Sequence, residues 1–463
     1  MKTPPPTLEM FLERMQRLQA QPGLGKRALG VAEWDAQLWQ LGRAALQAPA
    51  DRVGTTPIGG DVYLATQLYP AGGHTALMGD FIRALNAPSQ VIVTNALGHN
   101  KPPLSEKICA RLGLPASSIT LLSGPSLAER GEQLLAQLLA LQPRRLFLFH
   151  HPEDPLACVA AQPELAGQCV LVHHADSTPS FGLHLPGVRL IELNPIAAAM
   201  SRLLGLAPAL LRLTVPDPGP RPGGFLQRGH LVTATSGSQH KYTKPYVYNY
   251  AQTVAVILQA TRGRHLHIGP LDAVVLDNIH AVLGAAKVPL ESFLHVPWTP
   301  SVAACLWEHS CDVYCASFPI DGARTDAEVL ASGTPHLRHS TRPDNLSIEG
   351  GMVWNTWADL TTTLQSLTSA ELLAEKSRLL RRAYEQRHHP HIFAETLNNI
   401  LHDGEGAPDS QQPARDQRVI HSLMKSLTTS LIHQAERIEH LESLGNNAGR
   451  SLRARFLRWL QRG

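Results

Sequence analysis

Short apolar runs alternate with amphipathic stretches along most of the chain. In the first half, the runs DVYLAT, QVIVTN, RLFLFHH, CVLVHHAD and VRLIELN alternate with segments whose apolar residues recur every three or four positions, such as TALMGDFIRAL. Apolar runs of this length predict buried strands, and the spaced segments predict helices. Regular alternation of the two is typical of a parallel sheet covered on both faces by helices.

The alternation stops once and then begins again. Residues 214–230, TVPDPGPRPGGFLQRGH, are too rich in Pro and Gly for a strand or a helix, and we interpret them as an interdomain linker. After them, HLVTATSG, HLHIGP, SFLHVPW and DVYCAS alternate with helical segments through about residue 340. The sequence therefore predicts an α/β protein with two Rossmann-like parallel-sheet domains, at residues 56–222 and 223–402.

Both ends of the chain have a helical pattern. Residues 1–55 contain LEMFLERMQRLQ and EWDAQLWQLGRAAL and predict a helical extension, and residues 403–463 predict a polar linker followed by a helical tail. The tail ends in RSLRARFLRWLQRG, where five arginines are interleaved with apolar residues that include Phe456 and Trp459.

A basic segment of this kind is typical either of peripheral contact with an anionic membrane surface, with Phe456 and Trp459 inserted, or of a helix that packs on a partner, on another copy of the chain or on the protein itself. The sequence leaves both interpretations open.

Composition narrows the class of protein. The chain has 463 residues, of which 43% are hydrophobic and 17% charged, and no run reaches the roughly 18 apolar residues of a membrane span. Its six cysteines include no CxxC pair, and charges stand where a signal peptide would need its apolar stretch. We therefore expect a cytoplasmic protein with reduced cysteines. A net charge of +3 is too small to indicate a nucleic-acid partner.

The stretch SFPIDGARTDAEVLASGTPHL, at residues 317–337, carries the most specific chemistry. It predicts a loop that follows a strand and leads into a helix. Free backbone N–H groups and the helix dipole at such a helix start attract phosphate oxygens, and Arg324 and Thr325 would add a charge and a hydroxyl. Glu328 would accept hydrogen bonds from ribose hydroxyls. The alternative is a plain capping box, in which Thr325 and Glu328 satisfy the helix start themselves.

Neighbouring strand ends in the same domain offer further groups suited to a nucleotide. Small residues allow close approach of the backbone, a lysine reaches a diphosphate, and an aromatic ring flanks a base. The residues concerned are Ser236, Gly237 and either Lys241 or Lys244 in one loop, His267 and Gly269 in the next, Trp298 in a third, and Phe318, Pro319, Gly322 and Ala323 in the fourth. The chain has neither a dinucleotide fingerprint nor a P-loop, which disfavours hydride transfer and ATP hydrolysis.

With these residues the chain resembles the GT-B glycosyltransferases, in which two Rossmann-like domains face a cleft and the C-terminal one holds a nucleotide sugar. Residues 317–337 resemble in particular the Phe-Pro-x-x-Gly-x-x-Thr motif of O-GlcNAc transferase and the bacterial protein N-glucosyltransferases. The resemblance covers about residues 61–400. It implies that Arg324 and Thr325 belong to the phosphate loop, Glu328 to the ribose site and Lys241 to the diphosphate. One departure is that Gly322-Ala323-Arg324-Thr325 replaces the glycine-rich Gly-Gly-Thr-Thr of the family.

The N-terminal domain would then supply the acceptor side. Gly72, Gly73 and His74 stand at the start of a helix after the first strand, where a glycine pair lets a substrate approach the backbone. Two later strands end in His150-His151 and in His173-His174, the latter followed by Asp176. A histidine beside an acid is a common general base, and we name His74, His174 and Asp176 as catalytic candidates. The His-His-x-Asp pattern also suits a divalent metal, but the resemblance implies that none is needed.

We therefore predict a glycosyltransferase that moves a sugar from a nucleotide diphosphate donor, a UDP-sugar, to a protein or a glycan without a cofactor. Ile320 stands where a retaining family carries a glutamate, which favours an inverting reaction. Two alternatives stay open. A nucleotide-sugar epimerase of the same architecture would need two acids in the cleft, and a non-catalytic scaffold would lack the diphosphate-binding groups.

Overall fold

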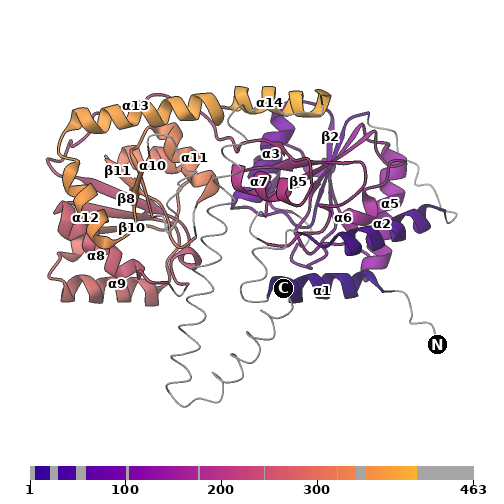
Figure 1. The fold of residues 1–463 in the computed structure, drawn as a ribbon, viewed down its shortest axis with the longest axis horizontal. Helices are drawn as coiled ribbons and strands as arrows, with labels where there is room; N and C mark the ends of the chain where they lie inside the picture. Colours follow the sequence, from indigo (N-terminus) through magenta and orange to yellow (C-terminus); the bar gives the residue numbers. More distant parts are fainter. Residues whose placement is uncertain are drawn as a thin grey trace, which may run out of the picture. The chain divides into compact units, whose positions relative to one another are not determined.

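The computed structural model describes residues 6–20, 30–47, 59–100, 104–175, 178–244, 246–320, 322–339 and 351–403. Within these residues the chain forms two all-parallel sheets with helices packed around them (Figure 1). The predicted α/β architecture with two Rossmann-like domains is confirmed. The predicted helical tail falls in residues 404–463, outside the described residues.

The first sheet has the strand order β3-β2-β1-β4-β5-β6-β7, so the order reverses between β1 and β4. Strand β1 pairs with both neighbours along its whole length, from Asp61 to Ala65. The elements of this domain are β1 Asp61–Ala65, α3 Gly73–Leu85, β2 Ser89–Val93, α4 Glu106–Leu112, η1 Ala116–Ser118, β3 Ile119–Leu121, α5 Leu127–Leu141, β4 Arg145–Phe149, α6 Leu156–Ala160, β5 Gln168–His173, β6 Val188–Glu192, α7 Pro195–Leu203 and β7 Ala209–Leu210.

The second sheet repeats this plan with the order β10-β9-β8-β11-β12-β13 and reverses between β8 and β11. Side chains of Asn249, Asp272 and Ser301 cap three of its helices, which fixes where each helix begins. Its elements are β8 Val232–Ser236, η2 Gln239–Lys241, α8 Tyr250–Thr261, β9 Arg264–Ile268, α9 Ala273–Ala285, η3 Leu290–Ser292, β10 Phe293–Val296, α10 Val302–Glu308, β11 Val313–Cys315, α11 Ala323–Ser332, β12 His336–His339, β13 Met352–Trp354 and α12 Trp357–Ser366.

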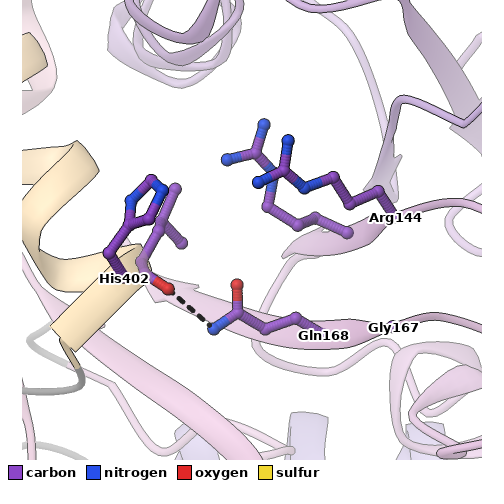
Figure 2. Close-up of a pocket in the computed structure, with 6 residues that line it drawn as sticks. Arg144, Gly167, Gln168 and His402 are labelled. Atoms are coloured by element: carbon purple, nitrogen blue, oxygen red, sulfur yellow. Dashed lines mark hydrogen bonds between the residues drawn. The ribbon is translucent and has the colours of Figure 1, made fainter.

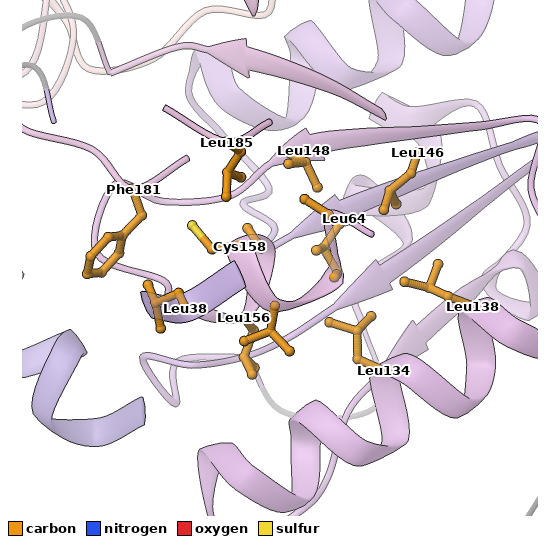
Figure 3. Packing of buried hydrophobic residues seen from close by; sticks show 14 of the residues in the cluster. Leu38, Leu64, Leu134, Leu138, Leu146, Leu148, Leu156, Cys158, Phe181 and Leu185 are labelled. Carbon is orange, nitrogen blue, oxygen red and sulfur yellow. The ribbon is translucent and has the colours of Figure 1, made fainter. Parts of the chain in front are cut away.

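Two helices precede the first sheet, α1 Leu8–Gln19 and α2 Ala32–Gln47. Phe11, Met15 and Leu38 from these helices are fully buried in the same apolar cluster as Leu148 of β4 and Phe181. Figure 3 shows Leu38 beside Cys158 and Phe181 in this cluster. The predicted N-terminal extension is thus part of the core of the first domain. Burial of each apolar side chain of this size stabilises the fold by about 1.5–3 kcal/mol.

Two helices follow the second sheet, α13 Ala370–Arg387 and α14 Pro390–Asp403. The apolar face of α14 packs on the first domain rather than the second. Its Phe393 meets Phe81 of α3 with ring centroids 5.4 Å apart, and Leu397 and Ile400 are fully buried in the same cluster. By its packing α14 therefore belongs to the first domain, although the predicted boundary at residue 402 grouped it with the second.

Among the described residues, no helix has the length and apolarity needed to cross a bilayer.

Candidate functional site

The carboxyl ends of β8 and β11 meet where the second sheet reverses its strand order. In doubly wound sheets ligands bind at this point, because the loops from the two strands diverge there and leave a crevice. The loop after β8 contains Gly237 and Lys241, and the loop after β11 leads through Gly322 into α11. Lys241, Arg324 and Thr325, which were predicted to bind the diphosphate, thus come from the two loops that the topology singles out, whereas Gly269 and Trp298 follow the neighbouring strands β9 and β10.

The start of α11 has the features of an anion site. Gly322 is its N-cap residue and, as a glycine, offers no side chain to cap the first turn. A Cβ atom placed on Gly322 would lie 3.4 Å from Nζ of Lys241, so the ammonium group stands beside the helix start. An ammonium group and the backbone N–H groups of a helix start together favour a phosphate at this place. The capping-box alternative is wrong, because the helix begins at Ala323 and neither Thr325 nor Glu328 caps it.

Glu328 already has partners in this structure. One carboxylate oxygen accepts a hydrogen bond from the backbone N–H of Val302 at 2.9 Å, at the start of α10. Burial raises the pKa of the Glu328 carboxyl, and the backbone N–H of Val302 opposes the rise. The side chain therefore joins α11 to α10 at the carboxyl edge of the sheet, and contact with a ribose would have to be made alongside this bond.

Arg324, at the start of the same helix, is bound to a residue of the first domain. Its guanidinium forms an ion pair with Asp80 of α3, in the first domain. Asp80 also binds Arg83 at 2.7 Å, and only 5% of its side chain is exposed. Arg324 thus links the first turn of α11 to the first domain.

The loop after β9 is held by a close backbone contact. Gly269 has a φ of +136°, and a Cβ atom there would lie 2.3 Å from the carbonyl oxygen of Gly237. His267 is fully buried and supports the same loop: its Nδ1 lies 2.6 Å from the hydroxyl of Tyr250, and its Nε2 donates to the Gly237 carbonyl at 3.1 Å. His267 was predicted to contact the nucleotide, but with both nitrogens occupied it acts as a support for the loop.

The other predicted donor-side residues differ in exposure. Trp298, after β10, has 68% of its surface exposed, as a residue available to a base would. Phe318 is buried and meets Trp354 edge to face at 5.5 Å, so it packs in the core beneath the loop. Ser236 is buried at the end of β8, Pro319 is half-buried, and Ala323 is exposed on the first turn of α11.

The histidines predicted to lie on the acceptor side gather where the first sheet reverses, at the ends of β1, β4 and β5. The rings of His74 and His174 lie 4.5 Å apart, and those of His74 and His151 lie 5.4 Å apart. The structure thus brings together His74 and His174, which are 100 positions apart in the sequence. Asp176, the third catalytic candidate, lies outside the described residues.

Hydrogen bonds to backbone carbonyls fix the tautomers of three of these histidines. Nε2 of His74 bonds the Phe149 carbonyl at 2.7 Å, Nε2 of His150 bonds the Phe181 carbonyl at 3.0 Å, and Nε2 of His174 bonds the His150 carbonyl at 3.0 Å. A carbonyl only accepts, so each Nε2 carries the proton and each Nδ1 keeps a lone pair. Burial lowers the pKa of His74 to about 4 and that of His150 to about 4, so both rings are neutral at pH 7.

Sequence reasoning did not find the groups that hold this cluster. Asp154, fully buried after β4, accepts hydrogen bonds from the hydroxyls of Thr66 and Thr94 and thereby ties three strand ends together. Glu192 receives His173 Nδ1 at 2.9 Å, and Ser201 also binds it. An acid at the end of an apolar strand, as in VRLIELN, was the available signal for Glu192.

Among the described residues, no group of three or more His, Cys, Asp or Glu side chains is placed to hold a metal ion. A pocket of about 220 Å³ lies elsewhere, at the amino ends of β4 and β5 (Figure 2). It is lined by Arg144, Gln168 and His402 among others, and the Gln168 amide donates to the Leu401 carbonyl. None of the predicted site residues lines this pocket.

Comparisons with known proteins identify the fold. No family model and no curated protein sequence matches the chain. Among solved structures, Anabaena HepE in complex with UDP is 11% identical with a TM-score of 0.56, and the match covers 74% of this chain and 100% of that one. The lipopolysaccharide outer core galactosyltransferase WaaB is 10% identical with a TM-score of 0.55, covering 74% and 99% of the two chains. Thermobaculum terrenum O-GlcNAc transferase, in a substituted form, is 15% identical with a TM-score of 0.50, covering 90% and 79%.

WaaB is a galactosyltransferase and the Thermobaculum protein an O-GlcNAc transferase, and the chain shares the two-domain GT-B fold with these structures. At identities this low, the likeness shows the fold alone.

Proposed function

We propose that the chain is a glycosyltransferase that moves a sugar from a nucleotide diphosphate donor to a protein or glycan acceptor. The observation that carries the proposal is the position of Lys241, whose ammonium group stands at the start of α11, beside the N-cap residue Gly322, where the second sheet reverses. A cation and free N–H groups at a switch point suit the diphosphate of a nucleotide sugar.

The donor nucleotide is proposed to be UDP. The structural neighbour HepE was solved in complex with UDP and with UDP-glucose, and it shares the fold of the domain that holds Lys241. In this proposal Trp298 flanks the uracil and Glu328 approaches the ribose. Thr325 and the backbone of Gly237, Gly269 and Gly322 surround the phosphates. No metal or other cofactor is required.

In the transfer, the bond between the sugar and the diphosphate breaks and negative charge builds on the leaving oxygen. Lys241 and the N–H groups of α11 would stabilise that charge, and interactions that strengthen as charge develops lower the barrier most. Arg324 would contribute only after it exchanges Asp80 for a phosphate, because the ion pair now occupies its guanidinium.

On the acceptor side, we propose His74 as the general base of an inverting reaction. Its Nδ1 is buried and has no hydrogen-bond partner among the described residues, while Nε2 is held by Phe149. An acceptor hydroxyl or amide would give its proton to Nδ1 as its oxygen or nitrogen bonds the sugar carbon and the diphosphate leaves. A resting pKa of about 4 is low for a base at pH 7. The negatively charged diphosphate of the bound donor would raise the pKa of His74 by stabilising the imidazolium form. His174 supports the His74 ring, and Asp176, outside the described residues, is proposed as a further acid of the site.

Calorimetric titration with UDP, GDP and ADP, each with and without magnesium, tests this function. We expect selective binding of UDP at micromolar concentration. Lys241→Ala should weaken it about 10- to 100-fold, since hydrogen bonds to charged groups contribute about 1.5–3 kcal/mol. Lys244→Ala is the matched control, because Lys244 is an exposed lysine in the same loop. The UDP affinity of this variant should stay near that of the unsubstituted protein. If no diphosphate binds, the proposal fails and a non-catalytic scaffold with the GT-B fold takes its place.

A further inference from the structure

The N-terminal helices are tied to one particular loop of the first domain. Asp35 of α2 is fully buried, and its two carboxyl oxygens accept the backbone N–H groups of Gly182 at 2.8 Å and His184 at 2.9 Å. Both acceptors of this carboxyl group thus bond residues 178–187, the β5–β6 loop. A buried carboxyl group is costly unless its oxygens are paired, and here the loop supplies the pairing.

Apolar and polar contacts from α1 and α2 reach the same loop. Phe181 is fully buried, with its ring 6.5 Å from that of Phe11 in α1 and 6.3 Å from that of Trp34 in α2. The Gln19 amide at the end of α1 donates to the Pro179 carbonyl at 3.1 Å. In Figure 3 the side chains of Phe181 and Leu38 lie close together, with Cys158 next to them. The loop is therefore held from one side by side chains of the two N-terminal helices.

The same loop also contacts the histidines proposed for the acceptor side, through the backbone of Phe181. The Phe181 carbonyl receives Nε2 of His150, and the His150 carbonyl in turn receives Nε2 of His174, whose ring lies 4.5 Å from that of His74. Gly182 has a φ of +96°, and a Cβ atom there would lie 3.5 Å from Cε1 of His150. The position of the loop thus sets the position of the His150 ring, and His150 sets that of His174.

From this chain of contacts we infer that Asp35 is a positioning residue for the acceptor-side histidines, and that α1 and α2 form part of the catalytic half of the protein. Asp35 acts through the β5–β6 loop and touches no substrate. The inference rests on the proposed function only for its consequence on transfer; the effect on the histidines is a property of the fold.

The test compares Asp35→Asn with a matched control in the full-length chain. Asparagine keeps the size of the side chain but turns one acceptor into a donor that faces a backbone N–H. Glu9→Gln is the control, because Glu9 also lies in the N-terminal helices and accepts a backbone N–H of the first domain, that of Leu127 at 2.9 Å, but in α5 rather than in the β5–β6 loop. Gln19→Ala is a milder second variant that removes the other polar tether to the loop and leaves the core intact.

Imidazole NMR of histidine-labelled protein is the first readout. We expect Asp35→Asn to shift the resonances of His150 and His174 and to move the titration midpoint of His150 from about 4 toward the ordinary value near 6.5. Gln19→Ala should shift the same resonances by less, and Glu9→Gln should leave them unchanged. If Asp35→Asn and Gln19→Ala both leave the histidine resonances as they are in Glu9→Gln, the inference is overturned.

UDP affinity and donor turnover are the second readout. Affinity for UDP should change by less than about twofold in Asp35→Asn, while kcat for sugar release from UDP-glucose should fall about tenfold or more. A fall in kcat without a loss of binding indicates that the variant has lost an interaction made only in the transition state. Equal kcat values in Asp35→Asn and Glu9→Gln would contradict a positioning role. Absence of UDP binding in the unsubstituted protein would instead refute the proposed function, and the NMR result would still decide the role of Asp35.

Discussion

Gly269→Ala should damage the donor loop, because Gly269 is the residue of this loop with the least space for a side chain. A Cβ atom on Gly269 would lie 2.3 Å from the carbonyl oxygen of Gly237, a backbone atom that has little freedom to withdraw. Contacts under 3.0 Å essentially never occur for real Cβ atoms, so the two loops would have to separate by several tenths of an ångström. The φ of +136° adds backbone strain for any residue other than glycine.

Strain of this kind costs about 1–3 kcal/mol, and the forced contact adds to it, so a loss of about 3 kcal/mol is expected. For a domain of 150–250 residues, each kcal/mol lowers Tm by roughly 2–4 °C, which gives a fall of about 6–12 °C. Movement of Gly237 would also displace Lys241, so the affinity for UDP should fall together with Tm.

Gly284→Ala is the control for this substitution. Gly284 lies in α9, and a Cβ atom there would meet nothing within 4 Å. Alanine should therefore stabilise the helix by about 0.5–1 kcal/mol and leave UDP binding unchanged. Thermal unfolding and calorimetric titration of both variants provide the assay. If Gly269→Ala melts at or above the temperature of the unsubstituted protein and binds UDP normally, the steric reasoning is refuted.

Three further predictions concern charged groups. Asp61 and Arg145 form a buried ion pair with two hydrogen bonds, of 2.6 and 2.7 Å. Asp61→Ala leaves a buried guanidinium unpaired and should lower the free energy of unfolding, measured with urea, by about 3–5 kcal/mol. A loss below about 1 kcal/mol would contradict this reasoning. Asp80→Asn should release Arg324 toward a bound phosphate and raise UDP affinity in calorimetry, whereas weaker binding would show that the ion pair helps to form the donor site. Burial lowers the pKa of His150 to about 4 and that of His267 to about 3, below the unfolded value near 6.5, so the unfolded chain takes up protons first as the pH falls. Stability should therefore be lost as the pH falls from about 6.5, down to about pH 4 for His150 and about pH 3 for His267, and the loss at about pH 5 is about 2 kcal/mol for each histidine. A Tm that stays constant from pH 7.5 to 5 would argue against neutral burial.

The pattern of apolar runs predicted the central strands of both sheets, because a parallel strand buried on both faces needs a continuous apolar segment. Strands β3 and β13 were not predicted. Each has only three residues and lies at a sheet edge, where a short, half-buried strand leaves little apolar signal. The return of α14 to the first domain was not predictable either, since an amphipathic helix shows that one face is buried but not against which partner.

The site could be predicted as far as loops and residue types, because parallel strands place their carboxyl ends at one edge. What the sequence does not contain is the pairing of distant side chains. Arg324 and Asp80 are separated by 244 positions, and their ion pair follows from the placement of α11 and α3. His267 alternates with apolar residues in a strand, and only the fold shows that it faces the core and bonds Tyr250 and Gly237.

A crystal structure of the full chain with UDP tests the central claim most directly, because the claim concerns where the diphosphate binds. The expected result is a β-phosphate at the start of α11, with its oxygens within roughly 3 Å of Nζ of Lys241 and of backbone N–H groups in the first turn, and with the uracil near Trp298. UDP bound away from the β8 and β11 loops, or a diphosphate with no contact to Lys241 or α11, would contradict the proposed donor site.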